Sequence, residues 1–258
     1  MNSNHTSDPL FQNTLVDVVR QSSHIFGSTI TNPSDLHAWT GLPVVFDEVF
    51  TGLYRLGRFS SASFLQTHPD ISCHAKLLTG GLVPLCTTLA SDSVYNAFLS
   101  SEKRDALLHG HSYTAHAVGC HVANTSLNAM MGMDQSGEWQ SYKEDWSASA
   151  QTTTTETEGK LDIWSVWSKD FIYSISKSKD VESVIGLGSV LAIALYDEQA
   201  GYSSSAAAGL QKKMLEGSTD FNVHSRVLGN VFYLMASQTS RPETLQQIER
   251  LLTDALVS

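Results

Sequence analysis

Long apolar runs are absent from this chain of 258 residues, and so is any excess of positive charge. No stretch approaches the roughly 20 apolar residues that a membrane-spanning helix needs. The chain carries 16 lysines and arginines against 26 aspartates and glutamates, for a formal net charge of -10, and no basic block offsets it. These absences argue against nucleic acids and anionic membrane surfaces as partners.

Cysteine is also scarce. The three cysteines, Cys73, Cys86 and Cys120, show neither paired spacing nor metal-site spacing, which favours an intracellular, reducing compartment. The first seven residues contain no arginine and lack the apolar core of a signal peptide, so they indicate no targeting segment. With 41% hydrophobic and 16% charged residues, the composition is that of a globular protein of one large or two small domains.

Two nucleotide-binding motifs are missing as well. The sequence GLGS at residues 186–189 lacks the third glycine of a dinucleotide fingerprint, and no G-x-x-x-x-G-K-[ST] phosphate loop occurs. We expect residues 181–195, which contain this GxG, to form one strand of a small sheet. The histidines His109, His111, His116 and His121, with Cys120 nearby, match the spacing of no closed zinc site, so we expect no metal.

Two short predicted strands are each followed by a residue that could do chemistry. The first is a β-branched run that ends in an acid at Asp47, and Lys76 lies just past the second, before a Thr-Gly-Gly turn. An acid and a lysine in these places suit a cofactor with a carbonyl group and a ring nitrogen. Lys76 could form a Schiff base and Asp47 could keep the nitrogen protonated, as pyridoxal 5'-phosphate (PLP) enzymes require. From these residues alone, a surface lysine and a strand-end aspartate are the simpler interpretation.

Three motifs, in this order, resemble those of the class III PLP-dependent aminotransferases. They are FDEVFTGLYRLGR at 46–58, PDISCHAKLLTGG at 69–81 and LLHGHSYTAHAVGC at 107–120. The third is most similar to the adenosylmethionine:8-amino-7-oxononanoate aminotransferases of biotin synthesis, including the fused fungal and plant enzymes. The resemblance implies a fold-type-I PLP-dependent transferase that moves an amino group from S-adenosyl-L-methionine to 8-amino-7-oxononanoate, giving 7,8-diaminononanoate.

The resemblance assigns roles to the residues of these motifs. It makes Lys76 the Schiff-base lysine and Asp47 the partner of the ring nitrogen. It assigns His111 and Ser112 to the cofactor phosphate, in a turn with Gly110 that the neighbouring subunit of a homodimer would supply.

Three residues are assigned to the substrate, namely Gly110, Arg55 and Arg226. Arg226 matches the arginine that binds a substrate carboxylate, for which a guanidinium fork is suited because it donates two parallel hydrogen bonds. Arg55 is expected in a loop near the cofactor. The alternatives are a solvated loop residue for Arg55 and a strand-surface residue for Arg226.

The alternation of apolar patterns predicts an α/β fold in two parts. Residues 1–132 would form the C-terminal part of a large PLP-binding domain with a mainly parallel sheet, and 133–258 a small C-terminal α/β domain. Residues 134–159 are polar and carry a threonine run, so we expect an insertion loop there. The predicted strands are 43–46, which we expect to be buried and parallel because both of its faces are apolar, 71–74 and 82–89. Asp8 as a cap and Pro9 at the first position predict the start of a helix. Further helices are predicted over 116–131, 163–176 and 242–257.

The N-terminal half of the family, which supplies a second phosphate turn and the aromatic that stacks on the cofactor, has no counterpart in this chain. Two alternatives therefore stay open, namely a truncated non-catalytic remnant or partner subunit, and another class III ω-aminotransferase. We expect the chain alone to be inactive and poorly soluble. The resemblance favours the mitochondrial matrix, with the cytoplasm as the alternative.

Overall fold

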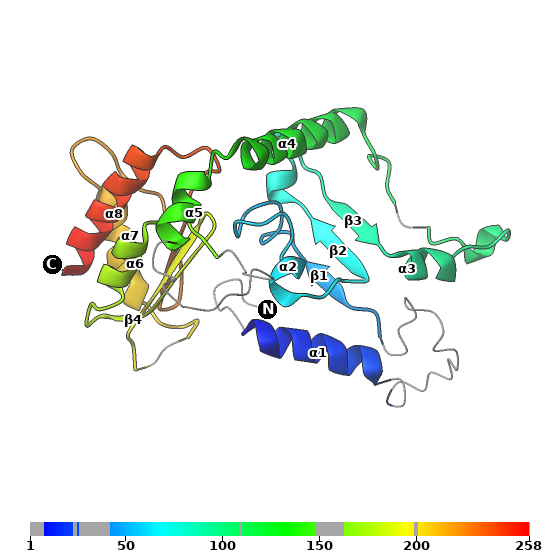
Figure 1. Ribbon diagram of the computed structural model, residues 1–258, viewed down its shortest axis with the longest axis horizontal. Helices are drawn as coiled ribbons and strands as arrows, with labels where there is room; N and C mark the ends of the chain where they lie inside the picture. Colours follow the sequence, from blue (N-terminus) through cyan, green and yellow to red (C-terminus); the bar gives the residue numbers. More distant parts are fainter. Residues whose placement is uncertain are drawn as a thin grey trace, which may run out of the picture. The chain divides into compact units, whose positions relative to one another are not determined.

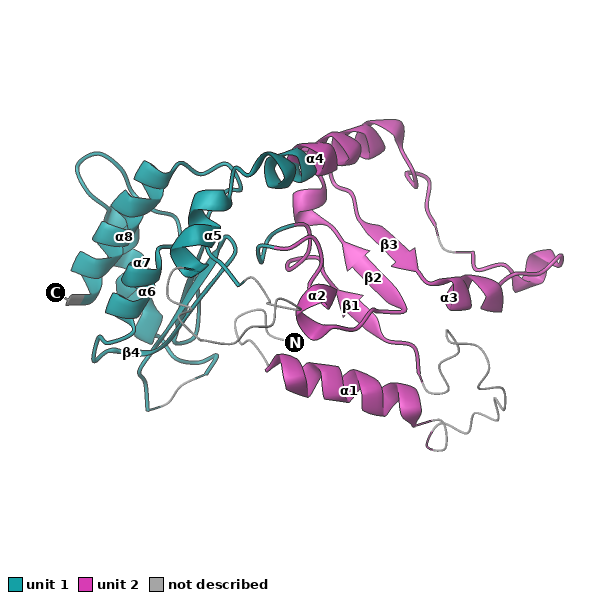
Figure 2. Ribbon diagram, in the orientation of Figure 1, with its two compact units in different colours: residues 1–5, 54–57, 130–258 teal, residues 6–53, 58–129 magenta. Residues whose placement is uncertain are grey.

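The computed structural model describes residues 8–22, 25, 42–108, 110–147, 163–198 and 201–257 (Figure 1). Within these ranges the chain forms two compact units (Figure 2). The N-terminal unit comprises residues up to 53 together with 58–129, and the C-terminal unit comprises 54–57 together with the residues from 130 onward. Each unit contains helices and a sheet, which confirms the expected α/β class. None of the helices in these ranges is long and apolar enough to cross a membrane.

The sheet of the N-terminal unit has three strands, in the order β1 (Val45–Asp47), β2 (Ile71–His74) and β3 (Thr87–Ala90). Strands β1 and β2 are parallel, whereas β2 and β3 are antiparallel. The bounds of β2 are those predicted from the sequence. Strand β3 begins later than expected because residues 79–86 form turns and irregular chain first.

Strand β1 is not buried, contrary to the expectation for residues 43–46. Val45 and Asp47 are both exposed. The reason is position, since β1 lies at the edge of the described sheet and pairs there with β2 alone. An apolar run can therefore mark a strand without showing which of its faces is covered.

Helix α1 (Pro9–Gln21) begins as the sequence predicts, because the carboxylate of Asp8 accepts hydrogen bonds from two backbone N–H groups of the first turn. A second aspartate, Asp70, fastens this helix to the sheet. One of its carboxylate oxygens lies 3.2 Å from the Arg20 guanidinium of α1 and accepts a hydrogen bond of 2.8 Å from the backbone N–H of Val44. Asp70 thus joins α1, the start of β1 and the start of β2.

Five further helical segments begin in the N-terminal unit. They are α2 (Ala62–Leu65), η1 (Lys76–Leu78), α3 (Asp92–Ala97), η2 (Lys103–Asp105) and α4 (Ala117–Ser136). Helix α4 is longer than the predicted helix over 116–131, and its last residues belong to the C-terminal unit.

The C-terminal unit contains a four-stranded antiparallel sheet. Its strands, in spatial order, are β4 (Val181–Leu187), β5 (Val190–Leu195), β7 (Val231–Met235) and β6 (Arg226–Leu228). The single strand expected over 181–195 is wrong, because the chain turns back at Gly188. This residue has φ +54°, and a Cβ there would lie 2.3 Å from the backbone nitrogen of Gly57. Only glycine satisfies both conditions.

Three helices pack with this sheet or with one another, namely α6 (Lys169–Ile175), α7 (Ala206–Glu216) and α8 (Pro242–Val257). Helix α8 has the predicted bounds. Helix α6 is shorter than the helix predicted over 163–176, because Ser168 caps it and accepts a hydrogen bond of 3.3 Å from the backbone N–H of Phe171. Before this cap, Ser165 forms a β-bridge with Gly188 instead of a helical turn.

The insertion loop predicted over 134–159 is wrong for residues 134–147. Helix α4 continues to Ser136, and α5 (Gln140–Ser147) follows it. Between them Trp139 is 2% exposed, with its ring 5.2 Å from that of Tyr54 and 5.8 Å from that of Trp164. Helix α5 is polar, so its composition resembles that of a loop, and the sequence pattern does not reveal that Trp139 beside it is buried. Residues 148–159 lie outside the described ranges, and the functional division at residue 132 stays a prediction.

Candidate active site

Asp47 is the last residue of β1, and its side chain is exposed. Its carboxylate accepts a hydrogen bond of 3.1 Å from the backbone N–H of Val49, which begins the turn after the strand. The next residue, Glu48, is 2% exposed and accepts hydrogen bonds from the hydroxyl of Ser60 at 2.6 Å and the backbone N–H of Ser61 at 2.8 Å. The hydrogen bonds of the buried Glu48 hold the turn after β1, and they thereby fix the backbone next to Asp47.

Lys76 begins η1, two residues after the end of β2, and its side chain is exposed. Its backbone has φ +47°, a left-handed conformation that is uncommon for a residue with a side chain. Backbone strain of this kind persists only where the surroundings impose it, and it is often found at functional sites. Two hydroxyl groups secure the turn here. Thr79 donates to the carbonyl of Val83 at 2.7 Å, and Ser126 of α4 donates to that of Leu77 at 2.8 Å.

These two residues share one edge of the sheet. The register of the parallel pair places Asp47 opposite Cys73, three residues before Lys76. Both strands therefore direct their carboxyl ends to the same edge (Figure 1), the edge at which ligands bind in open α/β sheets. The structure thus brings together an exposed carboxylate and an exposed amine, each on a secured turn.

The predicted phosphate turn, Gly110 to Ser112, is an exposed segment of the N-terminal unit that precedes α4. The backbone N–H of His111 donates to the hydroxyl of Thr114 at 2.8 Å, and the backbone N–H of Tyr113 donates to the ring of His111 at 3.1 Å. The backbone N–H of His111, a residue that the resemblance assigns to the cofactor phosphate, is therefore engaged within the turn itself. The Ser112 side chain is exposed.

Arg55 belongs to the C-terminal unit and is 9% exposed, so the alternative of a solvated loop residue is wrong. Its guanidinium lies 3.5 Å from the Ser189 hydroxyl, and its carbonyl accepts a hydrogen bond of 2.9 Å from the backbone N–H of Ser189. Burial lowers the pKa of the Arg55 guanidinium from its ordinary value. Its place in a substrate pocket stays a prediction.

Arg226 is also in the C-terminal unit, as the first residue of β6, opposite Tyr233 of β7. Its side chain is exposed at the edge of the four-stranded sheet and forms no ion pair with any acidic residue that the structure describes. This position agrees with either of the two interpretations of its role, a carboxylate ligand or a strand-surface residue.

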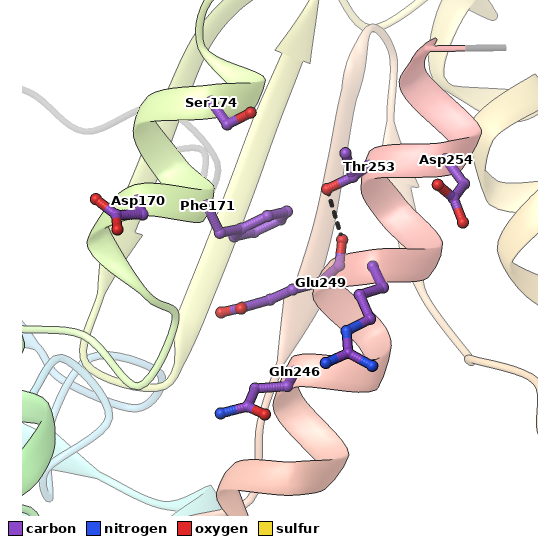
Figure 3. A pocket seen from close by; sticks show the side chains of 8 residues that line it. Asp170, Phe171, Ser174, Gln246, Glu249, Thr253 and Asp254 are labelled. Atoms are coloured by element: carbon purple, nitrogen blue, oxygen red, sulfur yellow. Dashed lines mark hydrogen bonds between the residues drawn. The ribbon is translucent and has the colours of Figure 1, made fainter.

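A groove of about 510 Å³ opens between α6 and α8 of the C-terminal unit (Figure 3). It contains Glu249, which is 8% exposed and whose carboxylate accepts hydrogen bonds from the backbone N–H and the hydroxyl of Ser168. Burial raises the pKa of Glu249, while the bonds from Ser168 act in the opposite direction. Both carboxylate oxygens are thus engaged in holding the start of α6, and none of the predicted site residues lines this groove.

Sequence reasoning missed the residues that support the two turns, namely Glu48, Thr79 and Ser126. Glu48 was detectable because it follows Asp47 directly. No pattern marked Ser126, which lies 50 residues beyond Lys76 and meets the η1 turn only in the folded chain. Among the residues described, no group of three or more His, Cys, Asp or Glu side chains could hold a metal ion.

Residues 34–199 match the protein family described as aminotransferase class-III. The chain is 57% identical to the bifunctional dethiobiotin synthetase/adenosylmethionine-8-amino-7-oxononanoate aminotransferase of Emericella nidulans, over 97% of this chain and 32% of that protein. It is 35% identical to the bifunctional dethiobiotin synthetase/7,8-diamino-pelargonic acid aminotransferase, mitochondrial, of Oryza sativa subsp. japonica, over 96% of this chain and 26% of that protein.

Two solved structures share the fold. The adenosylmethionine-8-amino-7-oxononanoate aminotransferase of Methanocaldococcus jannaschii matches with a TM-score of 0.65 and 24% identity, over 83% of this chain and 45% of that one. An amine transaminase from an uncultivated Pseudomonas species, in a PLP-bound form, matches with a TM-score of 0.64 and 22% identity, over 84% and 44%. The chain thus spans about a third of its fungal relative and less than half of either structure.

Proposed function

Because this chain belongs to the class-III aminotransferases, we propose that it carries the PLP site of an enzyme of biotin synthesis. The enzyme would move an amino group from S-adenosyl-L-methionine to 8-amino-7-oxononanoate and give 7,8-diaminononanoate. The names of the fungal and archaeal relatives support this choice of substrates. The names of the plant relatives support a mitochondrial location.

The proposed function rests mainly on one observation, namely that Asp47 ends β1 and Lys76 follows β2, at the carboxyl ends of two paired parallel strands. The donor set fits PLP, since the cofactor needs an amine for its aldehyde and a carboxylate for its ring nitrogen. The strained backbone of Lys76 adds support, because a turn with φ +47° is maintained by Thr79 and Ser126 at a cost in stability.

The roles of the two residues follow from their chemistry. When bound, PLP would take up the amino group from the donor and release it to the acceptor. Lys76 must present a neutral amine to hold the cofactor, and the same amine can carry a proton to and from the substrate carbon once it is free. Asp47 must stay ionised, so that it holds a proton on the ring nitrogen and favours electron withdrawal.

The remaining site residues are assigned to orientation. Ser112 and His111 would bind the cofactor phosphate, and Gly110 would approach the substrate, across the interface of a homodimer. Arg226 would bind the carboxylate of 8-amino-7-oxononanoate with two hydrogen bonds, which its exposed position at the start of β6 supports. Arg55, held by Ser189, would contribute positive charge to the same pocket.

The test uses a hybrid protein in which residues 1–258 replace the matching segment of the Emericella nidulans relative. We expect the hybrid to form 7,8-diaminononanoate from S-adenosyl-L-methionine, and the Lys76→Ala hybrid to form none. The unmodified relative is the control for folding and for the assay. A soluble hybrid that binds PLP but accepts only ω-amino acids would contradict the biotin reaction, and one that binds no PLP would contradict the site.

The chain alone tests a second candidate, a partner subunit without a complete site. Under this reading the 258-residue chain makes no product by itself and gains activity when the remaining part of the relative is added as a separate protein. Full activity of the chain alone would contradict it.

A further inference from the structure

His74 is the last residue of β2 and is 6% exposed. Side chains alternate along a strand, so His74 and Ser72, which is 9% exposed, share one face of β2. The ring nitrogen Nε2 of His74 lies 3.2 Å from the hydroxyl oxygen of Ser72. This contact fixes the rotation of the ring within the buried face.

The other ring nitrogen of His74 points toward the turn that follows Asp47. A Cβ built on Gly52 would lie 2.9 Å from His74 Nδ1, closer than real Cβ atoms approach other atoms. The backbone of Gly52 is not left-handed, so the imidazole and the adjacent turn, not the dihedral angles, demand glycine here. Gly52 in turn closes the turn, because its N–H donates to the carbonyl of Glu48 at 3.1 Å.

The ring thus contacts the Asp47 side of the site and is separated from Lys76 by a single residue, Ala75. Nδ1 is buried and finds no hydrogen-bond partner among the residues that the structure describes. A buried polar atom in that state is costly, and an apolar side chain would fill the same space without the cost. The imidazole therefore calls for a reason other than packing.

We propose that His74 is a positioning residue, whose ring rests on Gly52 and sets the turn after Asp47 at a fixed place relative to the turn that begins at Lys76. The inference rests on the proposed function, since it concerns the geometry in which these two residues would meet PLP. Small displacements in such constellations have large effects, because the reacting groups must be held to within about 0.5 Å.

The test is a double-mutant cycle in the hybrid protein, with Gly52→Ala, His74→Ala and both together. The readouts are the dissociation constant of PLP and the pH midpoint at which the visible absorption band of the bound cofactor changes. We expect Gly52→Ala to weaken PLP binding about tenfold or more and to shift the midpoint. The double variant should bind PLP more tightly than Gly52→Ala alone, because the added methyl group no longer meets the ring.

A second pair of variants separates position from packing. His74→Gln keeps a hydrogen-bonding group for Ser72, whereas His74→Leu keeps only apolar bulk. We expect the glutamine variant to retain the midpoint of the native hybrid and the leucine variant to shift it. Controls are Gly132→Ala, where a Cβ meets nothing within 4 Å, and Val16→Ala, a buried truncation on α1.

Each outcome bears on one claim. Losses in the double variant that equal the sum of the two single losses, or a midpoint that no His74 variant moves, would overturn the positioning role. A hybrid that shows no PLP band before any substitution would instead overturn the proposed function. If Gly52→Ala does not fold, the comparison of the glutamine and leucine variants still decides the question.

Discussion

Lys76 follows the end of β2 by two residues, at the sheet edge where the parallel strand β1 ends in Asp47. Each of the two residues belongs to a turn that other side chains hold in place. The turn after Asp47 is held by the buried Glu48, and the turn at Lys76 is held by Thr79 and Ser126. The proposed function depends on this relationship between Asp47 and Lys76.

The carboxylate of Asp47 should matter for catalysis and little for folding. In the hybrid protein we expect Asp47→Asn to lower kcat by about 10²- to 10³-fold, because a neutral amide cannot stabilise a protonated ring nitrogen. The free energy of unfolding should change by less than about 1 kcal/mol, since the side chain is exposed. Asp17→Asn, at an exposed site on α1, is the matched control. Turnover near that of the control would rule out the role.

Arg226 should act on the affinity for the keto acid. Arg226→Lys retains the charge and loses the two parallel hydrogen bonds, so the KM for 8-amino-7-oxononanoate should rise by roughly 10- to 100-fold, as the loss of a charge-assisted pair implies. The KM for S-adenosyl-L-methionine should change less. Steady-state kinetics of the hybrid with each substrate varied in turn decide this. Unchanged kinetics for the keto acid would leave Arg226 as a strand-surface residue.

Asp70 should contribute to the stability of the fold and not to catalysis. Asp70→Ala removes the ion pair with Arg20 and the hydrogen bond from Val44, and the Asp70 side chain is 7% exposed, so we expect a loss of about 2–4 kcal/mol in the free energy of unfolding. The control is Asp105→Ala, whose ion pair with Arg104 is exposed and should contribute less than about 1 kcal/mol. If urea denaturation showed equal losses of unfolding free energy for Asp70→Ala and Asp105→Ala, the stabilising role of Asp70 would be contradicted.

Glu249 should give the C-terminal unit a characteristic dependence on pH. Burial raises the pKa of Glu249 in the folded chain, so the folded state binds the proton more tightly than the unfolded state does. The contribution is therefore most favourable below the unfolded pKa and declines as the pH rises through the folded pKa. We expect Glu249→Gln to gain stability relative to the native chain as the pH rises. A relative loss over the same range would show that Ser168 outweighs the burial.

The motifs in the sequence were sufficient for the class of fold and for the two residues at the sheet edge. Capping signals and apolar periodicity predicted α1, β2 and α8, because the residues that determine these elements lie within or next to them. The same local signals failed at residues 134–147. There Trp139 is buried against Tyr54 and Trp164, and such distant contacts leave no periodic trace in a polar segment.

The hairpin at Gly188 illustrates a second limit. Val, Ile and Leu run on both sides of the glycine, so residues 181–195 resemble one long strand. The turn is imposed by the segment 54–57, whose backbone approaches Gly188 too closely for a Cβ, and by the hydrogen bond from Ser189 to Arg55. The burial of Arg55 has the same origin. Ser189, which contacts Arg55, lies 134 residues further along the chain, so no local sequence pattern predicts this contact.

The proposed function requires that Lys76 is the lysine that binds PLP. The 258-residue chain and the hybrid protein would each be incubated with PLP, reduced with borohydride, digested and mapped by mass spectrometry. We predict a single major phosphopyridoxyl label, on Lys76, which disappears in Lys76→Ala and persists in the control Lys212→Ala, at an exposed position on α7. A major label on any other lysine of residues 1–258 in the hybrid would rule out Lys76 as the Schiff-base residue.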